Sequence, residues 1–184
     1  INVNYNSSKY ITRNNNSIKI DDDFMDKIIY ENKISIIVHL GAQAGVRFSF
    51  QNPDEYMDIN VRGTLNILEL SKKHKVEKLI FGSSSSVYGT NSEVPFSEKD
   101  QTFNMISPYA ATKRMGEILC QTYSNIFGIK IACLRFFTVY GPRGRPDMAP
   151  YMFIRNILKK SPIRMFGDGS SARDYTFISD IIDG

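Results

Sequence analysis

Cysteine is scarce in this sequence, and the spacing of a zinc site or a disulfide framework is absent. The two cysteines, Cys120 and Cys133, are well separated in the chain, and neither belongs to a CxxC pair. No apolar run reaches the length of a membrane span, and the polar start INVNYNSSKY is not a signal peptide. These absences are typical of a reducing compartment, so we expect a cytoplasmic protein without a membrane partner.

A dense stripe of lysine and arginine is also missing, although the net charge is +4 at pH 7. Nucleic-acid binders concentrate basic residues on one face, so we expect no nucleic-acid partner. The small positive excess suits an anionic ligand such as a nucleotide, although ordinary surface charge is the simpler explanation. Three consecutive acids, Asp21, Asp22 and Asp23, are explained by the start of a helix, and we predict no metal site.

Three apolar runs rich in β-branched residues alternate with two long helical patterns. The runs are ISIIVHL, VEKLIFG and IKIACLRF, and the helical patterns cover residues 54–74 and 107–127. The second pattern ends near Gly128, a suitable C-cap. Continuous apolar runs of this length are typical of strands buried on both faces of a parallel sheet. Strands that alternate with helices predict right-handed crossovers and an α/β fold.

Small or polar residues follow each apolar run, in the strings LGAQAG, GSSSSVYG and FFTVYGPRGRPD. Ligands of open parallel sheets bind outside the carboxyl ends of the strands. Small residues let a ligand approach the backbone closely. The sequence therefore predicts a single ligand crevice lined by these three strand ends.

The string SPYAATK places Tyr109 and Lys113 four residues apart, on one face of the second helix. A nearby ammonium lowers the pKa of a phenol, which then accepts a proton at neutral pH. Such pairs are also common on ordinary surface helices. The hydroxyl cluster at the preceding strand end, with Ser84, favours the catalytic interpretation because it could bind the same substrate oxygen.

From residue 35 to the end, the sequence resembles the extended short-chain dehydrogenase/reductase superfamily, and within it the NAD-dependent epimerases and dehydratases of nucleotide sugars. The similar strings are VHLGAQAGVR, NPDEYMDINVRGTLNILE, SSSSVYG, SPYAATK, LRFFTVYGPRGRPDMA and RDYTFISDI. The resemblance implies a Rossmann-like, doubly wound parallel sheet. It also implies a partial NAD-binding domain over residues 1–142 and a partial substrate-binding region over 143–184.

By this resemblance Ser84, Tyr109 and Lys113 form a catalytic triad. Tyr109 removes the proton of the sugar 4-hydroxyl while C4 passes a hydride to NAD. The 4-keto sugar then turns over and takes the hydride back on its other face, and Lys113 also holds the nicotinamide ribose. The resemblance implies further cofactor contacts from Asp21, Gly41, Ala42, Gln43, Asn60 and Phe136.

The implied substrate is a UDP-sugar that is epimerised at C4. Related dehydratases and decarboxylases carry an acid beside the catalytic serine, whereas Ser85 and Ser86 follow it here and would lie along the sugar. The string FFTVYGPRGRPDM resembles the uronate-type enzymes, which implies UDP-glucuronate. UDP-glucose and UDP-N-acetylglucosamine are the alternatives.

The sugar carboxylate would then meet Thr138 and Arg145, because a guanidinium fork can bind both carboxylate oxygens. A solvent-facing loop arginine is the alternative for Arg145. Arg143 departs from the aromatic residue that is common in this loop of the family. Arg173 matches a family arginine that contacts the diphosphate.

The family's Gly-rich phosphate loop, GxxGxxG, is absent before residue 35. We therefore interpret the chain as an internal part of a longer enzyme. A non-catalytic remnant of the same fold is the alternative from another class. Family members are commonly homodimers through two long helices, here those expected at residues 54–74 and 107–127. Supply of a uronate sugar for polysaccharide biosynthesis is the implied role.

Overall fold

The structure is a computed structural model that describes residues 10–13, 16–19, 22–90, 93–163, 168–169 and 172–184. The chain forms two compact units, Ile1–Arg135 and Phe136–Gly184. The boundary predicted from the sequence lay between residues 142 and 143. None of the helices in the described residues is long and apolar enough to cross a membrane.

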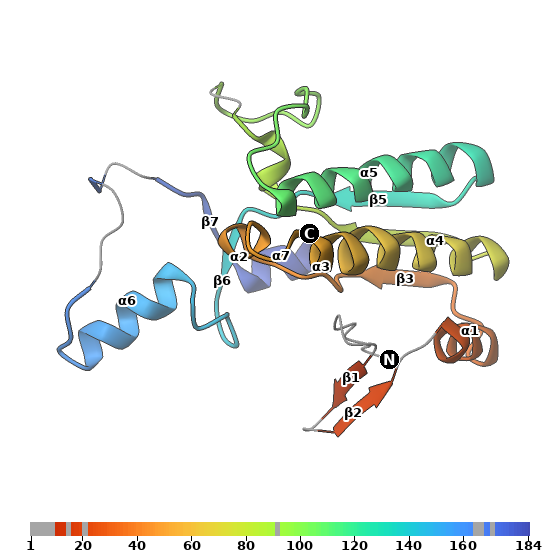
Figure 1. Cartoon of the computed structure of the whole chain (residues 1–184), viewed down its shortest axis with the longest axis horizontal. Helices are drawn as coiled ribbons and strands as arrows, with labels where there is room; N and C mark the ends of the chain where they lie inside the picture. The colour runs from red at the N-terminus through yellow and green to blue at the C-terminus, as the bar shows by residue number, and fades with distance from the viewer. Residues whose placement is uncertain (1–9, 14–15, 20–21, 91–92, 164–167, 170–171) are drawn as a thin grey trace. The chain divides into compact units, whose positions relative to one another are not determined.

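A three-stranded parallel sheet forms the centre of the first unit. Its strands are β3 (Ile36–His39), β4 (Lys78–Gly82) and β5 (Lys130–Leu134), in sequential order. Right-handed crossovers between strands in sequential order place both connecting helices on one face of the sheet. Figure 1 shows these helices, α4 (Gly63–Lys73) and α5 (Pro108–Phe127), running alongside the strands. The predicted α/β class is confirmed.

The helical pattern expected over residues 54–74 contains three consecutive segments. They are α3 (Pro53–Tyr56), a π-helix η1 (Met57–Arg62) and α4. Single π-turns inside helices are rare and occur often at functional sites. Periodicity predicted a regular helix here and missed the π-helical segment.

Local signals define both ends of α5. Ser107 is the N-cap, and its hydroxyl oxygen accepts a hydrogen bond from the backbone N–H of Ala110 at 3.1 Å. Pro108 occupies the first turn, where no backbone donor is needed. Gly128 closes the helix with φ 71°, a left-handed conformation, so the predicted C-cap is confirmed.

The core of the first unit lies between the sheet and its two long helices. It contains buried side chains from both layers: Leu68, Leu79, Phe81, Cys120 and Ile129. On the other face of β3, Ile36 and Val38 are 51% and 55% exposed. The prediction that this strand is buried on both faces is therefore wrong within this chain. Both connecting helices cover the same face.

The remaining elements are short. In the first unit they are β1 (Tyr10–Arg13), β2 (Asn16–Lys19), α1 (Asp22–Glu31), α2 (Val46–Ser49) and the 3-10 helix η2 (Ser85–Tyr88). The second unit contains β6 (Thr138–Tyr140) and β7 (Tyr175–Phe177), which pair in parallel, with α6 (Ala149–Leu158) and α7 (Ile178–Asp183).

Candidate active site

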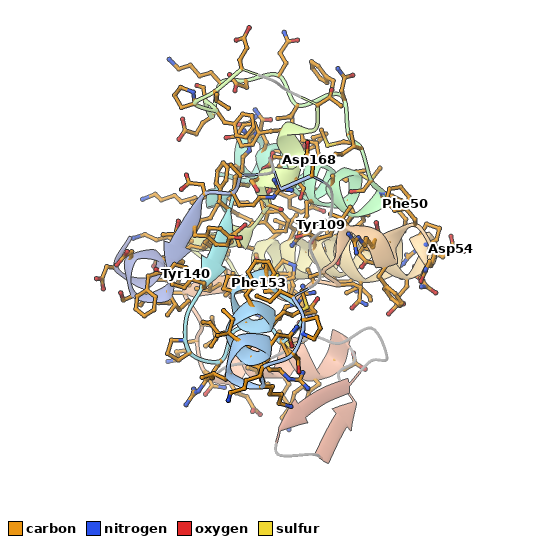
Figure 2. The ribbon with its side chains drawn as sticks, turned by 90° about the vertical axis from the view of Figure 1, so that its left-hand side faces the viewer. Phe50, Asp54, Tyr109, Tyr140, Phe153 and Asp168 are labelled. Carbon is orange, nitrogen blue, oxygen red and sulfur yellow. The ribbon has the colours of Figure 1, made fainter. Side chains whose placement is uncertain are left out.

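The end of strand β4 and the start of helix α5 carry the three predicted catalytic residues, Ser84, Tyr109 and Lys113. Strand β4 ends at Gly82 and runs directly into Ser83 and Ser84. Tyr109 lies in the first turn of α5, and Lys113 lies one turn later. In Figure 2, Tyr109 is seen from the side on which the strands of the sheet end.

Lys113 joins α5 to the end of β4. Its ammonium donates a 2.6 Å hydrogen bond to the carbonyl oxygen of Gly82 and lies 5.2 Å from the centre of the Phe81 ring. The side chain is buried. Burial lowers the pKa of Lys113 from 10.5 to about 8, because the charged form loses its hydration. The lysine is thus a cation whose proton is easier to lose than that of a surface lysine.

The ring of Tyr109 packs edge-on against Tyr56, with ring centres 6.1 Å apart. The hydroxyl of Tyr56 donates to the carbonyl oxygens of Ala44 and Gly45, at 2.9 and 2.7 Å. These bonds tie α3 to the loop that follows β3. Tyr109 therefore packs against a side chain, that of Tyr56, whose position is fixed by hydrogen bonds.

Ser84 is the N-cap of η2 and lies directly after β4, in a mostly buried position. Its oxygen accepts a hydrogen bond from the backbone N–H of Ser86, and its hydroxyl donates to the Ser86 oxygen, both at 3.2 Å. Ser85 and Ser86 are half-buried. The serine cluster is thus part of an ordered turn at the strand end.

Asn60 on the π-helix connects the loop after β3 with α5. Its carbonyl oxygen accepts from the N–H of Gln43 at 2.7 Å, and its amide nitrogen donates to the carbonyl oxygen of Gln43 and to the hydroxyl of Thr112, at 3.1 and 3.0 Å. Both amide hydrogens are therefore used inside the protein. The structure places Gly41, Ala42 and Gln43 half-buried in this loop. Asn60 holds the loop in position.

His39, at the end of β3, is buried and neutral. The hydroxyl of Thr64 donates to the carbonyl oxygen of Asn60 at 2.6 Å, so it accepts from Nε2 of His39 at 3.1 Å. Burial, together with the smaller effect of the positive charge of Lys113, lowers the pKa of His39 from 6.5 to about 4. This environment is that of a packing residue and does not suit a general base.

His39 is expected to make folding pH-dependent below neutrality. Between pH 6.5 and 4 the unfolded chain binds a proton that the folded chain does not, so the free energy of unfolding decreases as the pH falls. The full loss is about 3 kcal/mol, from a pKa difference of roughly 2.5 units. Urea unfolding of wild type and His39→Asn at several pH values measures this loss.

The matched control is His74, the other histidine of the chain, which is only partly buried and has its Nε2 2.8 Å from a carboxylate oxygen of Asp26. His74→Asn should keep the loss of stability that His39 causes, whereas His39→Asn should lack it. The same pH slope in His39→Asn and wild type would contradict this prediction.

The second unit contains the remaining predicted residues, apart from Asp21, which lies outside the described residues. Phe136 is half-buried. Thr138 pairs with Tyr175, and its N–H donates to the carbonyl oxygen of Asp174 at 3.2 Å. Strand pairing thus brings Thr138 close to the segment that carries Arg173, whose guanidinium is exposed and donates to a backbone carbonyl.

Arg145 is exposed and forms a two-point ion pair with Asp147. Its Nε donates to one carboxylate oxygen at 3.0 Å, and its Nη2 donates to the other. The hydrogen bonds from Arg145, together with its positive charge, lower the pKa of Asp147. The guanidinium therefore already shows the planar, two-point geometry that suits a carboxylate ligand.

Several residues of the site carry no signal in the sequence. Sequence reasoning missed the hydroxyls of Thr64 and Thr112, the carbonyl of Gly82 and the pair Glu117–Arg135 described below. Thr112 lies within the string SPYAATK, three residues after Tyr109, but nothing local shows that it would meet Asn60.

The parallel sheet, its helices and its strand-end site define a Rossmann-like α/β protein. The chain belongs to the NAD dependent epimerase/dehydratase family, whose model matches residues 4–184. It is 50% identical over 159 residues to a UDP-glucuronate 4-epimerase of Thermodesulfobacterium geofontis, covering 86% of this chain and 49% of that protein.

Solved structures agree with this fold. A UDP-glucuronic acid 4-epimerase of Bacillus cereus, in complex with UDP-glucuronic acid and NAD, is 41% identical and has a TM-score of 0.81, over 90% of this chain and 52% of that one. A UDP-glucose 4-epimerase of Thermotoga maritima is 33% identical with a TM-score of 0.84, over 89% and 54%. The chain spans about half the length of each of these relatives.

Proposed function

We propose that the protein containing this chain is an NAD-dependent nucleotide-sugar 4-epimerase that acts on UDP-glucuronate. The observation that carries the proposal is the buried Lys113 ammonium, held on Gly82 O one helical turn from Tyr109. Ser84 follows the same strand end. A phenol, a lysine and a serine hydroxyl in one small region suit proton removal from a sugar hydroxyl.

The described residues fit the nicotinamide end of NAD. Within the described residues, the Lys113 ammonium donates one hydrogen bond, to the carbonyl oxygen of Gly82. The other two hydrogens of the ammonium are available for ribose hydroxyls. Small residues, Gly41 and Ala42, form the loop after β3 and permit close approach of a ligand. The cofactor, when bound, takes a hydride from C4 of the sugar and returns it.

Tyr109 supplies the base in this proposal. It takes the proton of the 4-hydroxyl as the C4–H bond breaks, and the sugar becomes a 4-ketone. The Ser84 hydroxyl, which donates to Ser86 in this structure, rotates to donate its hydrogen bond to the same sugar oxygen. The positive charge of Lys113 favours the phenolate form of Tyr109. Return of hydride to the opposite face, with the proton returned by Tyr109, produces the C4 epimer.

Two kinds of support favour the uronate over neutral sugars. UDP-glucuronate 4-epimerases are 50% and 41% identical to this chain, whereas the UDP-glucose 4-epimerase of Thermotoga maritima is 33% identical. Arg145 also presents a guanidinium that already binds a carboxylate, that of Asp147. In the proposal the sugar carboxylate takes over part of this pairing.

The substrate is tested on the complete protein encoded by the gene that carries this sequence. We expect UDP-galacturonate to form from UDP-glucuronate with NAD, as separated by chromatography. Arg145→Ala should lower uronate turnover by about 10- to 100-fold, the usual loss for a hydrogen-bonded charged group, and should affect UDP-glucose turnover much less.

Arg155→Ala is the matched control, because Arg155 is an exposed arginine on α6. It should leave the turnover of both sugars unchanged. Equal losses on both sugars with Arg145→Ala would contradict the carboxylate role. An enzyme that turns over UDP-glucose or UDP-N-acetylglucosamine and not UDP-glucuronate would replace the proposed substrate. Inactivity on all three would overturn the epimerase and favour the non-catalytic alternative.

A further inference from the structure

A buried carboxylate, Glu117, lies on α5 one turn beyond Lys113 and is 5% exposed. One of its oxygens accepts from the hydroxyl of Ser83 at 2.6 Å and from Nε of Arg135 at 2.9 Å. The other accepts from Arg114 at 2.9 Å and from Nη2 of Arg135 at 3.0 Å. Four donors therefore converge on one side chain that the proposed chemistry does not use.

Arg135 makes a second kind of contact. The centre of its guanidinium lies 4.9 Å from the centre of the Tyr88 ring, and Tyr88 stacks on Phe96 with ring centres 4.6 Å apart and an interplanar angle of 8°. Tyr88 is the last residue of η2. One guanidinium thus binds both Glu117 on α5 and the end of the short helix that follows Ser84.

Ser83 and Tyr88 are the two ends of the segment that carries Ser84, Ser85 and Ser86. We call residues 83–88 the serine turn. Glu117 binds its first residue directly and binds its last residue through Arg135. Lys113 binds the residue just before it, Gly82.

We propose that Glu117 and Arg135 are positioning residues that fix the two ends of the serine turn to α5, and thereby set the place of Ser84 relative to Tyr109. This inference rests on the proposed function. Tyr109 and Ser84 come from different elements, so their relative position depends on what joins β4 to α5. A bidentate carboxylate–guanidinium pair defines both distance and orientation, which apolar packing does not.

The chemical state of Glu117 agrees with this role. Burial raises the pKa of its carboxyl, but hydrogen bonds from Arg135 and Ser83 outweigh burial and lower it. The group is therefore ionised at neutral pH. A buried ion pair is a costly way to stabilise a fold, and apolar side chains of similar size often do so better. The fixed geometry that the Glu117–Arg135 pair imposes on the serine turn is a reason for this protein to have a buried ion pair here.

A double-mutant cycle with Ser84 tests the proposal. We expect Glu117→Gln to lower kcat about tenfold or more, with a smaller change in KM, in the complete protein. In a Ser84→Ala background the same substitution should have little further effect, because the residue that it positions is already lost. Independent losses that multiply would show that Glu117 does not act through Ser84 and would overturn the proposal.

Backbone hydrogen exchange provides a measurement that does not depend on turnover. In Glu117→Gln, amides of the serine turn should exchange faster than in wild type. Glu69→Gln is the matched control, because Glu69 is an exposed carboxylate on α4 that accepts a hydrogen bond from Tyr123 on α5, and it should leave this exchange and kcat unchanged. Unchanged exchange of the serine turn in Glu117→Gln would overturn the proposal.

A second variant covers the case in which Glu117→Gln fails to fold. Arg135→Lys keeps the charge but loses the two-point contact and the flat surface against Tyr88. It should also lower kcat and speed exchange of the serine turn, and an unchanged kcat and exchange would count against the proposal. If wild type turns over none of the three UDP-sugars, the proposed function fails while the exchange result still decides whether Glu117 and Arg135 hold the serine turn.

Discussion

Replacing Tyr109 with phenylalanine is expected to lower UDP-glucuronate turnover by about 10²–10⁴-fold, the usual contribution of a positioned general base. The substitution removes the hydroxyl that takes the 4-hydroxyl proton and keeps the aromatic ring. The edge-on contact with Tyr56 is kept, so the fold around the site should persist. Chromatographic separation of UDP-glucuronate from UDP-galacturonate measures the loss.

Tyr123→Phe is the control for this substitution. Tyr123 also lies on α5, and its hydroxyl donates to Glu69. We expect this variant to turn over substrate at the wild-type rate. Wild-type turnover by Tyr109→Phe would refute the assignment of the base. Equal losses in both variants would show that removing any hydroxyl from α5 disturbs the enzyme through its fold.

Replacing Lys113 with methionine is expected to lower turnover by about 10²-fold or more, because the phenolate then lacks its neighbouring positive charge. The wild-type rate should also fall as the pH rises through about 8, where Lys113 loses its proton. This alkaline decrease should be absent from the residual activity of Lys113→Met. A rate profile of the same shape in both proteins would contradict the role of the ammonium.

Deprotonation of Lys113 at high pH lowers the rate but is expected to raise the free energy of unfolding. The pKa of Lys113 is 10.5 when unperturbed and about 8 in the fold, because burial disfavours the charged form. Between these values the unfolded chain binds a proton that the folded chain lacks, so the free energy of unfolding rises with pH, by about 3 kcal/mol in all. Urea unfolding between pH 8 and 10.5 measures this rise.

Lys113→Met should lack the rise in stability, whereas Lys72→Met should retain it. Lys72 is a lysine on α4 that pairs with Glu69 at the surface. Raising the pH should thus lower activity and increase the stability contributed by Lys113. Identical pH slopes of stability in Lys113→Met and wild type would show that Lys113 is not a buried cation in solution.

Much of the fold could be predicted because its signals are local. The three strands follow from apolar runs, and the C-terminal end of α5 follows from Gly128, whose left-handed φ of 71° is easiest for glycine. The spacing of Tyr109 and Lys113 follows from helix geometry alone. These features depend on residues only a few positions apart in the chain.

The π-helix could not be predicted, because the string around Asn60 has the periodicity of a regular helix. What distinguishes this segment is a contact with Gln43, seventeen positions away, and with Thr112, fifty-two positions away. The open face of the sheet was likewise missed. An apolar run indicates that a strand is suited to burial. Which helices cover each face of that strand depends on how the chain crosses the sheet.

The sequence by itself determined the α/β class, the order of strands and helices, and the residue types at the strand ends, since each follows from local periodicity or spacing. Only the tertiary structure decided which groups hold one another. Lys113 meets Gly82 across thirty-one positions and Glu117 meets Ser83 across thirty-four. The lowered pKa of Lys113 has the same origin, because burial is produced by residues that are distant in the chain and close in space.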